Sequence, residues 1–376
     1  MNLNRNHRPG QAIVGQHRPG QTIAGKHGSS QTITGVFFFF FGLLLFSTGV
    51  RAQDMNNPGD YMTAVNKARG DMDTKYMQYV SAAAHGRRAR KVEKLRLEVL
   101  DNITQSRYKT TDLPLYKGDN SLRQAAIAYI QMCYIIFSED YKKIVNMEEL
   151  AEQSVDEMQA YLLLQDKINE KLNEAFNNLD KAGKEFAAKY NVTINTEVSP
   201  LGAKIEAADK LNKHINAVFI AFFKANWEDN QMVKAMNDKK VNDLEQARSA
   251  LLSFASEGLK SLDTVKPFEG DPSLIVACRK ALQFYQQTAD KDIPKLTDFY
   301  VKQEEFEKLK KGMDAKGSGR TQADVDAYNK AVNDFNNSVK GFNQTNQKVN
   351  TARTQAVNDW NDTEKRFADD HMPHYR

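Results

Sequence analysis

PLYKGDNSLRQAAIAYIQMCY, residues 114–134, decides the fold, because a similar stretch, PFEGDPSLIVACRKALQFY, follows at residues 267–285. The pair Gly118-Asp119 recurs 152 residues later as Gly270-Asp271. In each copy a proline ends the preceding helix, the glycine permits a turn, and the aspartate carboxylate can cap the next helix. Both stretches are therefore predicted to join two helices, with a ligand-binding loop as the alternative reading.

Two further matches extend this similarity along the chain. Lys91-Val92 matches Lys240-Val241 at a spacing of 149 residues, and residues 176–187 match residues 357–368 at a spacing of 181. An insertion of about 29 residues near KKGMDAKGSGRTQADVDAY, residues 310–328, explains the longer spacing. We predict a tandem duplication with one helical unit over 54–193, a linker over 194–200 and a second unit over 201–372.

The distribution of proline predicts an all-α fold. Beyond residue 52 the chain has seven prolines, at positions 58, 114, 200, 267, 272, 294 and 373. The stretches between them are rich in Ala, Lys, Glu, Gln, Asn and Leu, and none alternates apolar and polar residues as a half-buried strand would. Long helices interrupted at the prolines are the expected architecture.

Apolar residues three and four positions apart predict which face of each helix is buried. After the first Gly-Asp turn this stripe is Leu122, Ala126, Tyr129, Cys133 and Ile136. Coiled-coil-like seams are predicted at Ile168, Leu172, Ala175, Leu179, Ala182 and Phe186, and at Val325, Tyr328, Val332, Phe335, Val339, Phe342, Asn346, Val349, Ala356, Trp360 and Phe367.

Three polar features accompany the second seam. Asn346 lies on the seam and is expected to set the helix register, while Arg353 is expected to extend its guanidinium to solvent. Six asparagines are expected to form a polar outer face that can bind a partner or glycans, with a merely solvated face as the alternative: Asn329, Asn333, Asn336, Asn337, Asn343 and Asn350.

Residues 1–52 read as a leader. Three decapeptides rich in Gly, Gln and Thr, predicted to be disordered, precede an uncharged apolar run over residues 36–46. That run is shorter than the roughly 20 residues of a membrane-spanning helix and is typical of a signal peptide. We expect cleavage after Ala52 and export to the periplasm or cell surface. The alternatives are an uncleaved membrane anchor, or a true start downstream of Met1.

The net charge argues against a nucleic-acid partner. The leader carries five basic and no acidic residues, so its removal leaves 47 basic and 48 acidic residues and changes the formal charge from +4 to −1. Nucleic-acid binding would need a basic domain or face. The basic run Arg87, Arg88, Arg90, Lys91, Lys94 and Arg96 is interpreted as a solvated helix face paired with Glu93 and Glu98, and an anionic-surface role is the alternative.

No catalytic or cofactor motif is present in the sequence, and no catalytic, cofactor-binding or metal-binding residue is predicted. His214 is interpreted as a helix-surface or core-edge histidine. Asp369, Asp370, His371 and His374 could hold a metal loosely, but a frayed terminus is the preferred interpretation.

Cys133 and Cys278 occupy non-equivalent repeat positions and are expected to be buried free thiols, with a disulfide as the alternative. The aromatic segment INAVFIAFFKANW, residues 215–227, is expected in the core, with a membrane-inserting hairpin as the alternative.

In its leader and its long amphipathic helices the chain resembles uncharacterised all-helical surface or periplasmic proteins of Gram-negative bacteria. The resemblance implies location and architecture and carries over no functional residue. The expected role is non-catalytic binding or scaffolding in the cell envelope, with an unidentified protein or envelope component as partner and contact with the membrane only through an uncleaved leader. An envelope metal-dependent hydrolase and a membrane-perturbing helical protein are the alternatives.

Overall fold

The computed structural model describes residues 55–85, 89–140, 151–194 and 199–375. Over these ranges the chain consists of helices and short connections without a strand, and its two isolated β-bridges, Tyr116 with Asp119 and Phe268 with Asp271, close tight turns. The all-α prediction is therefore confirmed. The predicted leader and its cleavage after Ala52 lie outside the described residues.

The first helices are α1 (Pro58–Ala84), α2 (Ala89–Thr111), α3 (Ser121–Ile135) and α5 (Val155–Lys189). They are followed by α6 (Pro200–Asn237), α7 (Val241–Leu262), α8 (Ser273–Gln287), α9 (Ile293–Lys316) and α10 (Gln322–His371). Two short π-helical segments, η1 (Ile136–Asp140) and η2 (Thr288–Asp292), continue α3 and α8, and the 3-10 turn η3 (Gly317–Gly319) joins α9 to α10.

Packing divides the chain into two units. The larger unit contains the described residues up to 220 together with 262–278 and 360–375, and the smaller unit contains 221–261 and 279–359. Helices α6, α8 and α10 each contribute residues to both units. This division follows helix packing, whereas the predicted boundaries at 54–193 and 201–372 follow sequence similarity, and they stay a prediction.

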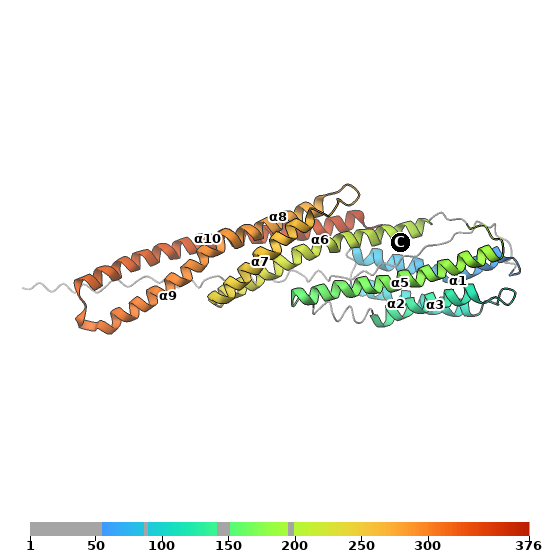
Figure 1. Cartoon of the computed structure of the whole chain (residues 1–376), viewed down its shortest axis with the longest axis horizontal. Helices are drawn as coiled ribbons and strands as arrows, with labels where there is room; N and C mark the ends of the chain where they lie inside the picture. The colour runs from blue at the N-terminus through green and yellow to red at the C-terminus, as the bar shows by residue number, and fades with distance from the viewer. Residues whose placement is uncertain (1–54, 86–88, 141–150, 195–198, 376) are drawn as a thin grey trace, which may run out of the picture. The chain divides into compact units, whose positions relative to one another are not determined.

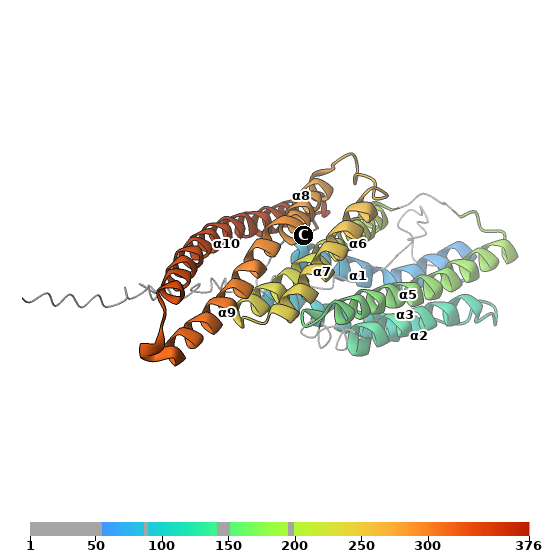
Figure 2. The ribbon, with the colours of Figure 1, turned by 60° about the vertical axis from the view of Figure 1, so that its left-hand side comes forward.

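In the larger unit α1, α2, α3 and α5 run side by side (Figures 1 and 2). Helix α1 packs against α2, and α3 packs against both α2 and α5. Asn57 caps α1 by accepting hydrogen bonds from the backbone N–H groups of Gly59 and Asp60. The predicted stripe of α3 and the Ile168, Leu172, Leu179 and Phe186 positions of the α5 seam are buried, as the spacing indicated.

In the smaller unit α9 and α10 form a hairpin (Figure 1). Stacked aromatic rings join the two helices: Phe306 lies 4.6 Å from Phe335, and Phe299 lies 4.4 Å from Phe342 between ring centroids. The predicted insertion, residues 310–328, comprises the end of α9, the η3 turn and the start of α10. Gly317 turns the chain there with φ +47°, a left-handed conformation that glycine adopts without strain.

The two Gly-Asp turns have the same geometry. Gly118 and Gly270 adopt φ values of +83° and +89°. Asp119 Oδ1 accepts a hydrogen bond from Ser121 N, and Asp271 Oδ1 accepts one from Ser273 N, both at 2.8 Å. The aspartates therefore cap α3 and α8, as predicted.

A second local arrangement also recurs at a spacing of 152 residues. Arg96 is paired with Glu93 and donates to the carbonyl of Phe137 in η1 at 3.4 Å. Arg248 is paired with Glu245 and donates to the carbonyl of Ala289 in η2 at 3.4 Å. The Lys91-Val92 match has a spacing of 149 residues, three fewer than the 152 residues between these contacts. A surface lysine recurs by chance more often than an arginine that is bonded to a helix carbonyl, so the contacts are the better guide to the spacing. The duplication itself stays a prediction.

Candidate functional site

The C-terminal residues are held in place as far as Tyr375, so the predicted fraying is wrong for them. Helix α10 continues to His371, and the Tyr375 backbone N–H donates to Ser81 Oγ at 3.0 Å. His85 Nδ1 lies 2.6 Å from Asp369 Oδ1, and the ring of His85 stacks on that of His374 with centroids 3.8 Å apart. The described ranges contain no group of three His, Cys, Asp or Glu side chains that could hold a metal ion.

His371 and His214 belong to the aromatic cluster behind the second Gly-Asp turn. His371 Nε2 lies 2.9 Å from Asp271 Oδ2, and this contact is the main reason that the pKa of Asp271 is lowered. The half-buried ring of His214 packs on Phe268 and Phe367, with centroids 5.5 and 5.6 Å away. Burial lowers the pKa of His214, and its core-edge position was predicted.

The first turn uses a different partner for the equivalent carboxylate. Asp119 Oδ2 accepts hydrogen bonds from Lys189 Nζ at 2.8 Å and from Tyr190 Oη at 3.1 Å. The bond from Lys189 is the largest cause that holds the pKa of Asp119 well below its usual range. Each carboxylate thus caps one helix, as the sequence predicted, and also anchors the end of another, which the sequence did not predict.

Both cysteines are free and buried, as expected. Burial raises the pKa of the Cys133 thiol to about 12, so the reactive thiolate is suppressed. The thiol of Cys278 donates to the carbonyl of Val218 at 3.6 Å. Neither position has the electropositive, accessible surroundings of a reactive cysteine.

The basic run has the predicted pairing where the structure describes it, but the solvated-face prediction is wrong at Arg96, whose side chain is only 12% exposed. Arg96 lies 2.7 Å from Glu93, and Lys94 lies 3.8 Å from Glu98. Arg87 and Arg88 lie outside the described residues. In the aromatic segment of α6, Phe222 is buried and Phe219, Phe223 and Trp227 are half-buried. No helix in the described part of the chain is long and apolar enough to cross a membrane.

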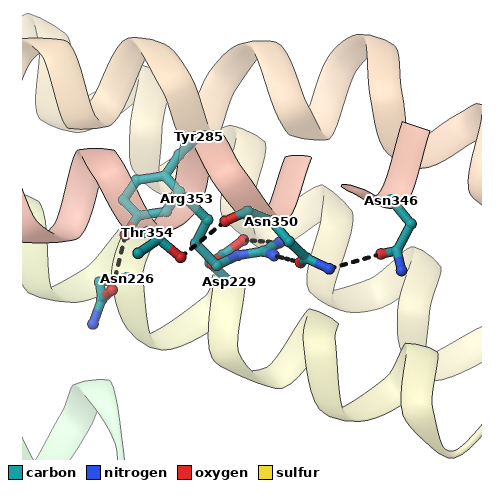
Figure 3. A network of polar contacts seen from close by, with 7 residues as sticks. All are labelled: Asn226, Asp229, Tyr285, Asn346, Asn350, Arg353 and Thr354. Atoms are coloured by element: carbon teal, nitrogen blue, oxygen red, sulfur yellow. Dashed lines mark hydrogen bonds and ion pairs between the residues drawn. The ribbon is translucent and has the colours of Figure 1, made fainter. Parts of the chain in front are cut away.

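Arg353 does not extend to solvent, so that prediction is wrong. Its guanidinium forms a two-pronged ion pair with Asp229 of α6, with Nε–Oδ2 and Nη2–Oδ1 distances of 2.5 and 3.0 Å (Figure 3). Only 15% of the Arg353 side chain and 1% of the Asp229 side chain is exposed. A buried carboxylate attracts the guanidinium inward because neither charge is solvated there.

The network around this pair also changes the interpretation of Asn346. Asn350 bridges Arg353 and Asn346: its Oδ1 accepts from Arg353 Nη1 at 2.5 Å, and its Nδ2 donates to Asn346 Oδ1 at 3.3 Å (Figure 3). All three residues belong to α10. This hydrogen bond of Asn346 lies within its own helix and gives no support to a role in setting the helix register, which stays a prediction.

The predicted asparagine face of α10 is exposed along its whole length. Asn329, Asn333, Asn336, Asn337, Asn343 and Asn350 are all exposed. The opposite side of the helix carries Phe342 and Val349, which are buried. The spacing of three and four residues between the apolar positions of α10 predicted this face.

Sequence reasoning missed a second site, a pair of buried charges on α1. Arg69 and Asp73 are 3% and 1% exposed. Neither Arg69 Nε nor either carboxylate oxygen of Asp73 has a hydrogen-bond partner among the described residues. Burial raises the pKa of Asp73 to about 7, and the charge of Arg69 opposes that rise. The signal in the sequence was the spacing of four residues, which places both charges on the face that carries Met62, Tyr76 and Val80.

Comparison with known proteins gives no relative: no family model, no curated protein and no solved structure matches the chain.

Proposed function

We propose that the chain is an exported helical-bundle protein that binds or organises other components of a bacterial cell envelope and is not an enzyme. The observation that carries the proposal is the exposed asparagine face of α10. An amide side chain donates and accepts hydrogen bonds, and burying it against a partner costs less than burying a charge. Such a face can therefore be covered by another protein or by a polar envelope component.

The α9–α10 hairpin supports a role as a binding arm. The aromatic rings between the two helices fix α10 from its inner side, so its outer side can contact a partner without unfolding the hairpin. The hairpin also contains the residues that the second half has in excess of the first under the proposed duplication.

The experiment is fractionation of the native host, followed by crosslinking and mass spectrometry. It tests cleavage after Ala52, location and partner together. A variant with Asn333→Glu, Asn336→Glu and Asn343→Glu should be exported and folded but should lose its crosslinks, because a partner would have to bury three new charges. The matched control is Asn242→Glu, Gln246→Glu and Ser249→Glu, three exposed uncharged positions of α7 in the same unit.

The proposal has two parts that can fail separately. Crosslinks that persist in the α10 variant would show that the asparagine face is not the binding surface. Recovery of the full-length chain in the cytoplasmic fraction would show that the export assignment is wrong.

A further inference from the structure

A cavity lies in the larger unit where α1, α3 and α5 meet. Its volume is about 20 Å³, enough for one water molecule or small ion. Its walls are mostly apolar and come from Met62, Leu122, Phe176, Leu179 and Gly183, while Asn66, Arg69 and Asp180 add polar atoms. Because Gly183 has no side chain, α5 leaves space on this side of the bundle.

The electrostatics of the cavity favour a negative occupant. Arg69 is the buried arginine in its wall, and the Nε of its guanidinium has no hydrogen-bond partner among the described residues. The nearby Asp73 does not offset this charge fully, since its pKa near 7 leaves it partly protonated at neutral pH. The carboxylate of Asp180 is already paired with Lys184 at 2.6 Å. A buried guanidinium without a full counter-charge is costly, and an anion beside it would lower that cost.

The Arg69 guanidinium lies over the Tyr129 ring, 5.5 Å from its centroid. This cation–π contact is with an uncharged ring, so it does not supply a counter-charge to the guanidinium.

We propose that the cavity beside Arg69 binds a small monovalent anion of the size of chloride or formate, held by the Arg69 guanidinium. The small volume excludes larger anions, and the apolar wall from Leu122, Phe176 and Leu179 excludes hydrated ones.

Thermal unfolding of the full-length protein tests the proposal. The melting temperature is measured in sodium chloride, sodium formate and sodium gluconate at one ionic strength of about 0.15 M, which keeps general screening constant. Gluconate is too large for the cavity and serves as the reference. The expected result is a melting temperature about 3 °C higher in chloride, in formate or in both than in gluconate. The salt that gives the larger rise identifies the preferred anion.

The substitution Arg69→Met should remove this difference. The matched control is Arg353→Met, since Arg353 is a buried arginine that already has a carboxylate partner. The control variant should melt earlier in every salt and keep the difference between chloride or formate and gluconate. If Arg69→Met does not fold, diffraction from wild-type crystals grown in bromide decides the question, and an anomalous peak beside Arg69 Nε is expected. Equal melting temperatures of the wild type in all three salts, a difference that persists in Arg69→Met, or a water in place of the bromide would overturn the proposal.

Discussion

Replacing Asp73 by asparagine should remove much of the pH dependence of the stability of the larger unit. Asp73 is 1% exposed, and its two carboxylate oxygens lack hydrogen-bond partners among the described residues. Burial raises its pKa from 3.8 to about 7. Because the folded-state value is the higher one, folding takes up a proton between these two pKa values. The stabilisation is complete below pH 3.8 and is lost as the pH rises through 7.

The magnitude follows from the shift. Each pKa unit corresponds to about 1.4 kcal/mol, so the ionised form of Asp73 costs the folded state roughly 4 kcal/mol once the pH is well above 7. Between pH 5 and pH 8 the loss is roughly 3 kcal/mol, because part of the change has already occurred below pH 5. An asparagine has the same shape and cannot ionise, so this loss should be absent in Asp73→Asn.

The assay is urea unfolding of wild type and Asp73→Asn at pH 5, 6, 7 and 8. The free energy of unfolding of the variant relative to wild type should rise by roughly 3 kcal/mol between pH 5 and pH 8. Glu364 should also make the free energy of unfolding fall as the pH rises, since burial raises its pKa to about 7 as well. Glu364→Gln therefore serves as the matched comparison. Parallel stability curves for wild type and Asp73→Asn would refute the reasoning, because they would show that Asp73 titrates alike in the folded and unfolded chains.

The remaining predictions concern packing, pairing and reactivity. Gly258→Ala should destabilise the smaller unit by about 1–3 kcal/mol in urea unfolding, because the new Cβ would lie 2.9 Å from Leu282 Cδ1. At Gly312 a new Cβ meets open space, so Gly312→Ala should stabilise the same unit by about 0.5–1 kcal/mol. Arg353→Met should lower the free energy of unfolding by about 3–5 kcal/mol, because it leaves the buried Asp229 carboxylate without a partner. Adding Asp229→Asn should recover part of that loss, and an additive double mutant would contradict the pairing. Cys133 and Cys278 should react with a thiol reagent only after unfolding, and rapid labelling of the native protein would contradict their burial.

Apolar spacing and turn chemistry were sufficient to predict the helical architecture. The stripe from Leu122 to Ile136 and the Gly118-Asp119 turn appear in the structure as predicted, because both depend on interactions within a few residues of the chain. The asparagine face of α10 was predicted for the same reason, since a helix fixes the opposite side once its buried side is known. The candidate site on this face was therefore accessible from sequence.

Buried charges were harder to predict because their partners lie far away in sequence. Arg353 was expected to reach solvent, since the pattern of α10 gives no hint of Asp229, a residue 124 positions earlier. The C-terminal histidines were expected to fray, since their contacts with Ser81 and His85 are also long-range. The spacing of Arg69 and Asp73 places them on the buried face of α1, but two charges four residues apart usually form a surface pair, so their burial became clear only from the packing of the helices.

Under the proposed duplication, the two halves agree where helices join and differ where charges are buried. The Glu-Arg-carbonyl contact at η1 recurs at η2, and the Gly-Asp turn recurs with the same hydrogen bond. By contrast, the buried charges are held differently: Arg353 of α10 is paired with Asp229 of α6, whereas Arg69 Nε and both carboxylate oxygens of Asp73, all on α1, lack a hydrogen-bond partner among the described residues. Arg353 is therefore satisfied within the protein, and Arg69 is the buried arginine that the proposed anion would complete.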